Sequence, residues 1–250
     1  MRVYAFIPAR FKSTRFPGKP LAPIAGKPMI EHVYRRALSC PDISDVFVAT
    51  DDERISSCVH GFGGKAIGTE KTHPSGTDRI AEAVRILDLG EDDLIVNIQG
   101  DQPLFEPAIV SDVINPIKEN PRIQMTTVMF RIADETEVED PKHVKVVTDK
   151  EGFALFFSRS PIPYFRDFNS KKVYYKHLGF YAYRAGFVRT FASLPVGQLE
   201  SSEKLEQLRV LENGFKIKVV ETAFDSIEVD TPEDIKRVER MMQKQATHRE

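Results

Sequence analysis

The sequence has few cysteines, little excess charge and no long apolar run. It contains two cysteines, Cys40 and Cys58, in 250 residues, and no Cys-x-x-Cys pair. This count excludes a disulfide-built scaffold and a cysteine-built zinc site, and it fits a reducing compartment. The formal net charge is −2, from 35 Lys and Arg against 37 Asp and Glu. That balance argues against nucleic acid as a partner, because binding phosphate backbones needs a concentrated basic surface.

No segment approaches the ~20 apolar residues that span a bilayer. The apolar run at residues 3–7 is followed by Pro8 and Arg10, and no long apolar region or small-residue cleavage site follows. This pattern predicts a buried first strand and not a secretion signal. We therefore expect a cytoplasmic protein without membrane insertion.

Several common catalytic and nucleotide-binding motifs are also missing. There is no G-x-x-x-x-G-K-[ST] and no H-E-x-x-H, and no Ser/His/Asp or Cys/His arrangement stands out. The stretch 61–64 lacks the third glycine of the dinucleotide fingerprint and precedes a predicted strand. It is better interpreted as the end of a helix and a turn.

Apolar strands alternate with amphipathic helices over the first hundred residues. The predicted strands are 3–7, 46–49 and 93–98, and the predicted helices are 27–39, 51–61 and 77–87. This order is typical of an α/β fold with a mainly parallel sheet flanked by helices.

The pattern changes from about residue 123. Further strands are predicted at 125–132, 144–148, 153–158, 178–184 and 216–221, with a helix at 202–213 and a final helix opening at Thr231-Pro232. There is no repeat or flexible linker. We therefore expect a single domain over residues 1–250, with a smaller mixed antiparallel extension at 123–185.

The loop after the first predicted strand is rich in cations. It holds Arg10, Lys12, Arg15 and Lys19, together with the hydroxyl of Ser13. The loop follows a buried strand, so it lies at the carboxyl edge of the sheet, where open α/β folds bind ligands. Arginine binds phosphate oxygens through a planar fork, and lysine supplies a mobile point charge. A charge run is often only a solvated surface, but this position predicts a phosphate-binding loop.

Two carboxylates are candidate metal ligands. Asp101 follows the predicted strand over 93–98, where a carboxylate can hold Mg²⁺ against phosphate oxygens. Asp230 comes directly before the predicted final helix. The alternatives are a turn-forming Asp101 and an Asp230 that only complements the helix dipole. The basic loop on the same fold favours the metal site.

Other polar residues carry weaker signals. Ser75, before the predicted helix at 77–87, is either part of a phosphate or base contact or an ordinary N-cap. A histidine before an apolar strand, such as His177, is more often structural, and a glutamate on a helix, such as Glu206, is usually solvated. Arg159 and Gln207 are similar cases, and the residues alone leave these alternatives open.

Eight segments occur in an order that resembles one enzyme family. They are residues 6–10, 13–15, 17–21, 75–79, 97–101, 177–179, 205–209 and 229–234. Together they resemble the CMP-Kdo synthetases, the 3-deoxy-manno-octulosonate (Kdo) cytidylyltransferases of Gram-negative lipopolysaccharide synthesis. The resemblance implies a nucleotide-diphospho-sugar transferase fold, CTP and an acidic eight-carbon sugar as substrates, Mg²⁺ as cofactor, and a cytoplasmic homodimer with contacts near residues 125–180.

The resemblance also implies roles for individual residues. The residues that match the CTP-binding loop and the other nucleotide contacts are Arg10, Ser13, Arg15, Lys19, Ser75 and Arg79. Gln99 matches a position that faces the base or the sugar. Asp101 and Asp230 match the metal ligands, and with Arg15 and Lys19 they are the expected catalytic residues. The acidic-sugar pocket is matched by Arg159, His177, Tyr181, Glu206 and Gln207.

The chain departs from the family pattern at a few positions. Gln102 stands where many members have glutamate, and segments 174–177 and 225–230 resemble a subgroup that activates 8-amino-3,8-dideoxy-manno-octulosonate. Glu206 and Glu228 are candidate acceptors for an ammonium at C8 of that sugar. The rival interpretations are a CMP-sialate or hexose-1-phosphate nucleotidyltransferase and a non-catalytic nucleotide-binding protein.

Overall fold

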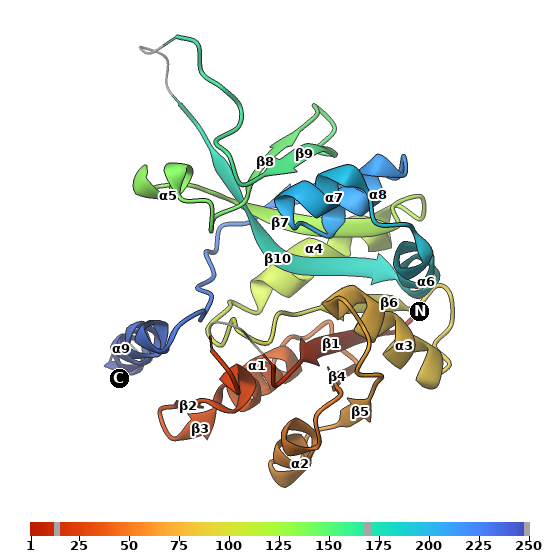
Figure 1. Ribbon diagram of the computed structural model, residues 1–250, viewed down its shortest axis with the longest axis vertical. Coiled ribbons are helices and arrows are strands. Elements are labelled where there is room, and N and C mark those ends of the chain that lie inside the picture. Colours follow the sequence, from red (N-terminus) through yellow and green to blue (C-terminus); the bar gives the residue numbers. More distant parts are fainter. Residues whose placement is uncertain (13–15, 168–171, 248–250) are drawn as a thin grey trace.

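One mixed sheet organises the chain. The computed structural model describes residues 1–12, 16–167 and 172–247. The strand order of the main sheet is β11-β7-β10-β6-β1-β4-β5, and a β8–β9 hairpin attaches to β10 (Figure 1). The strands are β1 (Val3–Ala9), β4 (Asp45–Thr50), β5 (Ala66–Gly68), β6 (Leu94–Asn97), β7 (Met125–Arg131), β8 (Lys145–Thr148), β9 (Ala154–Ser158), β10 (Tyr175–Arg184) and β11 (Lys218–Glu221), with a separate hairpin of β2 (Pro23–Ile24) and β3 (Lys27–Pro28).

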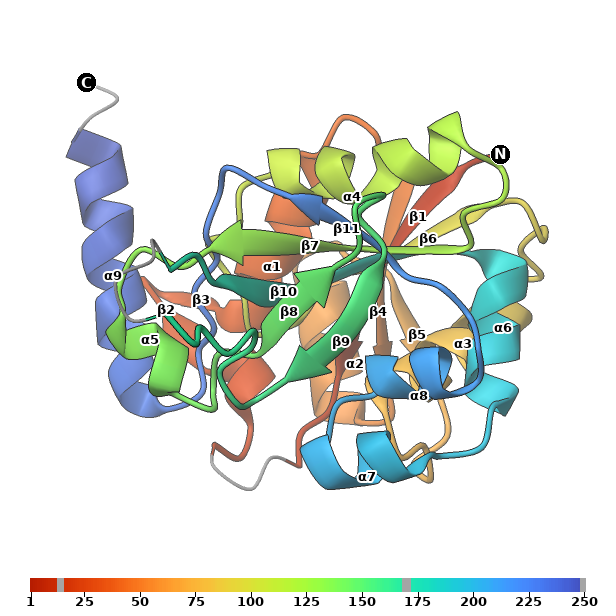
Figure 2. The same cartoon turned by 90° about the horizontal axis from the view of Figure 1, so that it is seen from above.

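Helices cover both faces of this sheet. They are α1 (Met29–Leu38), α2 (Glu53–Gly61), α3 (Gly76–Ile86), α4 (Ala108–Glu119), α5 (Thr136–Glu139), α6 (Ala185–Ser193), α7 (Gln198–Glu203), α8 (Gln207–Glu212) and α9 (Pro232–Thr247), with a 3-10 helix, η1 (Lys19–Leu21). Helices α1, α2 and α4 share one apolar core with the sheet, and α3, α6 and α8 share another (Figure 2). In β1, Ala5 and Ile7 face the first core and Phe6 faces the second. Burial on both faces explains the continuous apolar run of this strand.

Strand β10 runs against its two neighbours in the main sheet. It is antiparallel to both β6 and β7, whereas β1 pairs in parallel with β4 and β6, and β11 pairs in parallel with β7. The β8–β9 hairpin is antiparallel and joins the sheet at the start of β10. The predicted mainly parallel sheet with a smaller antiparallel extension is therefore confirmed.

An irregularity in β10 faces the carboxyl edge of the parallel strands. The pairing of β10 with β7 shifts register between Leu178 and Tyr181. Gly179 lies in this stretch, and a Cβ there would approach Gln99 Cγ to 3.0 Å, so only glycine leaves room for the Gln99 side chain. Gln99 Nε2 donates a hydrogen bond of 3.0 Å to the Gly179 carbonyl. Such bulges redirect neighbouring side chains, and here His177 and Tyr181 flank the bulge.

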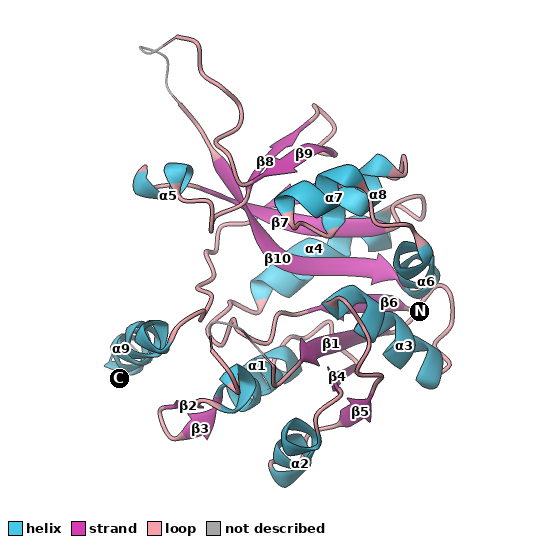
Figure 3. Ribbon diagram, viewed as in Figure 1, coloured by secondary structure: helices cyan, strands magenta, loops and turns pink. Residues whose placement is uncertain are grey.

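The helix predicted over 202–213 is wrong. The chain forms two short helices there, α7 and α8, because Lys204 adopts a left-handed conformation with φ 54° and ends α7 (Figure 3). A buried ion pair joins the two helices: Arg209 Nε and Nη2 donate to the Glu200 carboxylate at 2.7 and 2.6 Å. Helix α4 was not among the predicted helices, although five of its apolar side chains are buried.

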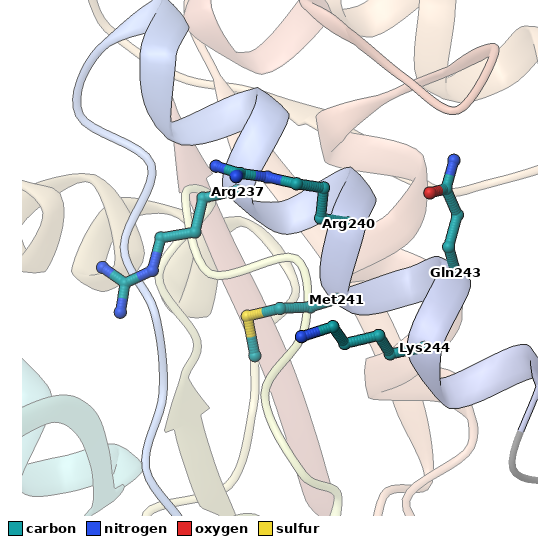
Figure 4. A pocket seen from close by; sticks show the side chains of 5 residues that line it. All are labelled: Arg237, Arg240, Met241, Gln243 and Lys244. Carbon is teal, nitrogen blue, oxygen red and sulfur yellow. The ribbon is translucent and has the colours of Figure 1, made fainter.

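Helix α9 begins where the sequence predicts it. The Asp234 carboxylate accepts hydrogen bonds from the backbone N–H groups of Asp230 and Thr231, both at 2.9 Å, and so caps the first turn. The helix packs through Val238 on a small cluster with Ile24 and Met29. Its outer side carries a hollow lined by Arg237, Arg240, Met241, Gln243 and Lys244 (Figure 4). Among the described helices, none has the length and apolarity needed to cross a bilayer.

Removing one member of the ion pair between α7 and α8 should destabilise the fold strongly. Glu200 and Arg209 are 8% and 4% exposed, so Glu200→Ala leaves a buried guanidinium without its partner. We expect a loss of about 3–5 kcal/mol in the free energy of unfolding, measured with urea. As a control, Lys65→Ala removes an exposed ion pair with Asp45 and should cost at most about 1 kcal/mol. Equal small losses in both variants would contradict a structural role for the buried pair.

Candidate active site

Two hollows meet at the carboxyl edge of the parallel strands. One has a volume of about 340 Å³ and lies between the end of β1 and the start of α3; we call it the basic hollow. The other has a volume of about 810 Å³ and lies along β10 and the segment before α9; we call it the wide hollow. Gln99, Asp101 and Asp230 line both. The basic hollow is also lined by Arg10, Lys19, Ser75 and Arg79, and the wide hollow by Glu137, Arg159, Lys176, His177 and Glu228.

The basic hollow gathers the predicted nucleotide contacts that the structure describes. Ser75 Oγ accepts a hydrogen bond from the Asp78 backbone N–H at 3.2 Å, so Ser75 is the N-cap of α3 and lines the hollow as well. Arg79 is buried, and its Nη2 lies 3.1 Å from Asp51 Oδ1. Burial lowers the pKa of Arg79, and the Asp51 carboxylate opposes this shift. Arg10 is exposed at the rim.

Two predicted loop residues, Ser13 and Arg15, lie outside the described residues. Their expected contacts with the triphosphate therefore stay predictions.

Two carboxylates and one ammonium lie where the hollows meet. Lys19 Nζ is 2.6 Å from Asp101 Oδ2 and 3.5 Å from Asp230 Oδ1, and it also donates to the Val229 carbonyl at 2.9 Å. Lys142 Nζ lies 3.6 Å from the other oxygen of Asp230. The segment before α9 is tied to the end of β6 by a hydrogen bond of 2.9 Å from Val229 N to the Asp101 carbonyl. These contacts bring together residues that are at least 82 positions apart in the chain.

This acid pair, Asp101 and Asp230, fits a magnesium ion. Mg²⁺ in phosphoryl-transfer sites is usually held by one or two carboxylates, with the remaining positions filled by water and substrate phosphates. In the described part of the chain, no group of three or more His, Cys, Asp or Glu side chains converges as a self-contained metal cage. Two carboxylates beside a phosphate-sized basic hollow are the donor set that such a shared ion requires.

A third carboxylate lies close to the acid pair. Burial raises the pKa of Glu228 to about 7, and the charges of Asp101 and Asp230 act in the same direction. Gln102 Nε2 donates a hydrogen bond of 3.1 Å to Glu228 Oε1. Sequence reasoning selected Glu228 from its spacing to Asp230 but placed no role on Gln102, which is fully buried.

The predicted sugar-pocket residues divide between two adjoining hollows. Arg159 and His177 line the wide hollow, whereas Tyr181 and Glu206 line an inner hollow of about 220 Å³. Gln207 lines both.

The walls of these hollows are anchored by hydrogen bonds. Arg159 Nε donates to the Glu203 carbonyl at 2.8 Å. Thr77 Oγ1 donates to Glu206 Oε2 at 2.8 Å, and burial raises the pKa of Glu206. A side chain of α3 and the side chain of Glu206, the residue before α8, are thus joined at the boundary between the basic and the inner hollow.

Sequence reasoning missed a buried lysine in the wide hollow. Lys176 is 4% exposed, and its Nζ lies 2.7 Å from Glu137 Oε2 and 2.9 Å from Asp225 Oδ2. Its signal in the sequence is a charged residue near the start of a strand whose residues are mostly apolar or aromatic. Its partners come from α5 and the segment before α9, and no spacing rule connects them.

The partly buried His177 should make stability depend on pH. Burial lowers the pKa of His177 to about 3, and its Nε2 is 2.9 Å from Thr127 Oγ1. Below pH ~6.5 the unfolded chain binds a proton that the folded chain does not, so the free energy of unfolding falls. Between pH 7 and pH 5 we expect His177 to contribute a loss of about 2 kcal/mol, which His177→Gln should remove. Identical pH dependence of urea unfolding in both proteins would contradict this.

Comparisons with known sequences identify similar proteins that are cytidylyltransferases by name. A family model described as cytidylyltransferase matches residues 4–219. A protein of Shewanella baltica (strain OS185) named 8-amino-3,8-dideoxy-manno-octulosonate cytidylyltransferase is 54% identical over 243 residues, which are 97% of this chain and 99% of that protein. A protein of the same name from Shewanella piezotolerans (strain WP3 / JCM 13877) is 57% identical over 237 residues, 94% of this chain and 96% of that protein.

A solved structure is similar over almost the whole fold. It is CMP:2-keto-3-deoxy-manno-octonic acid synthetase complexed with CTP, with a TM-score of 0.92 and 41% identity, covering 98% of this chain and 100% of that chain. A 4-diphosphocytidyl-2C-methyl-D-erythritol synthase from Anaerococcus prevotii, at 15% identity and a TM-score of 0.62, shares the fold. The predicted resemblance to the CMP-Kdo synthetases is confirmed, and this chain belongs to the cytidylyltransferase family.

Proposed function

We propose that this protein transfers CMP from CTP to the anomeric hydroxyl of 8-amino-3,8-dideoxy-manno-octulosonate or Kdo and releases pyrophosphate. The observation that carries the proposal is the junction of two hollows at the acid pair of Asp101 and Asp230. One hollow offers cations for a triphosphate, and the other offers space and polar groups for a sugar. The Shewanella relatives are named for the 8-amino sugar, and the similar structure for the Kdo reaction.

The basic hollow supplies the groups that a nucleoside triphosphate needs. Arg10 is free to bind phosphate oxygens at its rim, and the first turn of α3 offers backbone N–H groups beside Ser75. Positive charge here stabilises the pyrophosphate as it leaves, because charge on the bridging oxygen grows in the transition state. The transfer forms a bond between the sugar O2 and the α-phosphorus and breaks the bond to the β-phosphate.

The wide and inner hollows supply neutral and charged contacts for a hydroxylated acid. The low pKa keeps the imidazole of His177 neutral near pH 7, so it can exchange hydrogen bonds with hydroxyls without adding charge. Arg159 and Gln207 add donors for a carboxylate and hydroxyls. Gln99 lies on the walls of all three hollows, between the nucleotide and the sugar.

We propose that Asp101 and Asp230 hold Mg²⁺ together with the phosphates. A bound magnesium ion would supply Lewis acidity at the α-phosphate and lower the proton affinity of a hydroxyl nearby. Lys19 contacts both carboxylates, so it limits their repulsion and keeps them oriented. Its ammonium also stands within reach of the phosphates in the basic hollow.

We further propose a cytoplasmic homodimer that assembles through residues 123–185. Leu155 and Tyr164 in this region are 62% and 81% exposed, and contact with a second copy would bury them. The reaction consumes CTP, which the cytoplasm supplies. Residues 1–250 would act as one nucleotidyltransferase domain, with 123–185 as its dimerisation subdomain.

A panel of substrate pairs tests the proposed reaction. Pyrophosphate release is followed with CTP, UTP or ATP and with Kdo, its 8-amino analogue, a sialic acid or a hexose 1-phosphate, each with Mg²⁺. We expect release only with CTP and the octulosonates. Release with sialic acid or a hexose phosphate would identify a different nucleotidyltransferase, and CTP binding without release would indicate a non-catalytic protein.

Neutralising either acid of the pair should stop turnover while CTP still binds. Asp101→Asn and Asp230→Asn keep the size of the side chain and lose the charge that a hard cation needs. We expect the turnover number to fall by at least about a hundredfold in each variant, while calorimetry shows a much smaller change in CTP affinity. Turnover near the wild-type rate in either variant would remove that residue from the metal site.

Arg10 and Lys12 form a matched pair for testing the basic hollow. Both are exposed cations of one loop, but Arg10 lines the hollow and Lys12 does not. Arg10→Ala should weaken CTP binding by about 1.5–3 kcal/mol, the usual value of a charge-assisted hydrogen bond. Lys12→Ala should change CTP affinity less than about threefold. If calorimetry gives the same affinity for both variants, the triphosphate does not lie in this hollow.

A further inference from the structure

The Glu228 carboxylate on the wall of the wide hollow lacks a cation. Its Oε1 accepts a hydrogen bond from Gln102 Nε2 at 3.1 Å. Within the described residues, its Oε2 has no hydrogen-bond partner, and no lysine, arginine or histidine lies within ion-pair distance. The side chain is only partly buried and lines the hollow, so a ligand can reach it. This carboxylate can therefore accept a hydrogen bond from a bound ligand.

The position of this carboxylate is fixed by its neighbours. Gln102 is fully buried, and it also accepts a hydrogen bond of 3.1 Å from Ser226 Oγ. Ser226, Glu228 and Asp230 alternate with Ile227 and Val229, which pack on the small apolar cluster beneath α9. The extended segment therefore directs its polar side chains to the hollow and buries Val229 in the core, while Ile227 lies at the boundary of the two.

Four other acids of the wide hollow have cation partners, and a fifth, Asp140, is exposed and accepts a hydrogen bond of 2.8 Å from the Lys142 backbone N–H. Glu137 and Asp225 contact the Lys176 ammonium, and Asp101 and Asp230 contact Lys19. Glu228 makes no ion pair with Lys19, and among the described residues no group of three or more His, Cys, Asp or Glu side chains is placed to hold a metal. A carboxylate that is held in place but not neutralised favours a cationic ligand group.

We propose that Glu228, positioned by Gln102, accepts a hydrogen bond from the ammonium at C8 of the sugar and so favours the 8-amino sugar over Kdo. The inference rests on the proposed function, which places the anomeric C2 hydroxyl at the acid pair. In the pyranose ring, C2 and C6 are bonded to the same oxygen, and C6 carries the C7–C8 chain. The chain that carries the C8 substituent therefore begins one ring oxygen away from the reacting carbon. Glu228 is two residues from Asp230.

At C8, the 8-amino sugar carries an ammonium group and Kdo carries a hydroxyl. A carboxylate gains a charge-assisted hydrogen bond from the ammonium, whereas the hydroxyl gives an uncharged donor. A site with such a group should discriminate by about tenfold or more in kcat/KM.

Glu228→Gln tests the contact because it keeps the shape and removes the charge. We expect kcat/KM for the 8-amino sugar to fall at least about tenfold, mainly through KM, while kcat/KM for Kdo changes less than about threefold. Gln102→Met removes the hydrogen bond to Glu228 and keeps the side-chain volume. It should shift the ratio of kcat/KM for the two sugars in the same direction, by a smaller factor. Circular dichroism and CTP affinity check that both variants are folded.

Two matched glutamates locate the effect. Glu151 is exposed in the turn between β8 and β9, and Glu151→Gln should leave kcat/KM for both sugars unchanged. Glu137 lines the same hollow but is paired with Lys176. If Glu137→Gln shifts the preference between the sugars and Glu228→Gln does not, the ammonium contacts the lysine cluster and the proposal is wrong.

The remaining outcomes also decide the question. If kcat/KM falls equally for both sugars in Glu228→Gln, or changes for neither, the proposal is overturned and the proposed function stays intact. If the wild-type protein turns over neither sugar, the proposed function fails instead. Calorimetric binding of the 8-amino sugar and Kdo to wild-type and Glu228→Gln protein then tests the contact by itself, and equal affinities throughout would overturn it.

Discussion

Electrostatic balance around Asp101 and Asp230 is the constraint on which the site depends. Two carboxylates brought this close repel each other, and the Lys19 ammonium between them makes the arrangement stable. Lys19 is the first residue of η1, Asp101 lies in the turn after β6, and Asp230 lies just before α9. The backbone bond from Val229 to Asp101 fixes the last of these segments. Strand order, loop and final helix must therefore all be correct before the acid pair exists.

Charge and polarity then divide the edge of the sheet into two sides. The basic hollow is lined by Arg10, Arg79 and Lys19, the cations to which we assign the triphosphate. The other side has a neutral His177 and side chains held by hydrogen bonds, and its cations Lys142 and Lys176 are paired with carboxylates. Because Gln99 lies on both sides, a small movement of β6 against β10 would affect nucleotide and sugar together.

The sequence predicted elements that depend on local patterns. The apolar runs of β1 and β6, the cap of α9 and the approximate bounds of α1, α2 and α3 follow from periodicity and capping. The single helix over 202–213 was wrong because a left-handed Lys204 and the buried Glu200–Arg209 pair are not visible in periodicity. Contacts between distant segments, such as Lys176 with Glu137, also have no local signal. The family resemblance named residues from distant segments, such as Asp101 and Asp230, that the structure brings to the same hollows.

The product formed at the acid pair tests the account most directly. Wild-type protein is incubated with CTP, Mg²⁺ and the 8-amino sugar, and the mixture is analysed by mass spectrometry before the product hydrolyses. The account predicts a species with the mass of the sugar plus CMP less one water, together with one pyrophosphate for each molecule formed. CTP that stays intact, or pyrophosphate released without the CMP-sugar adduct, would contradict it.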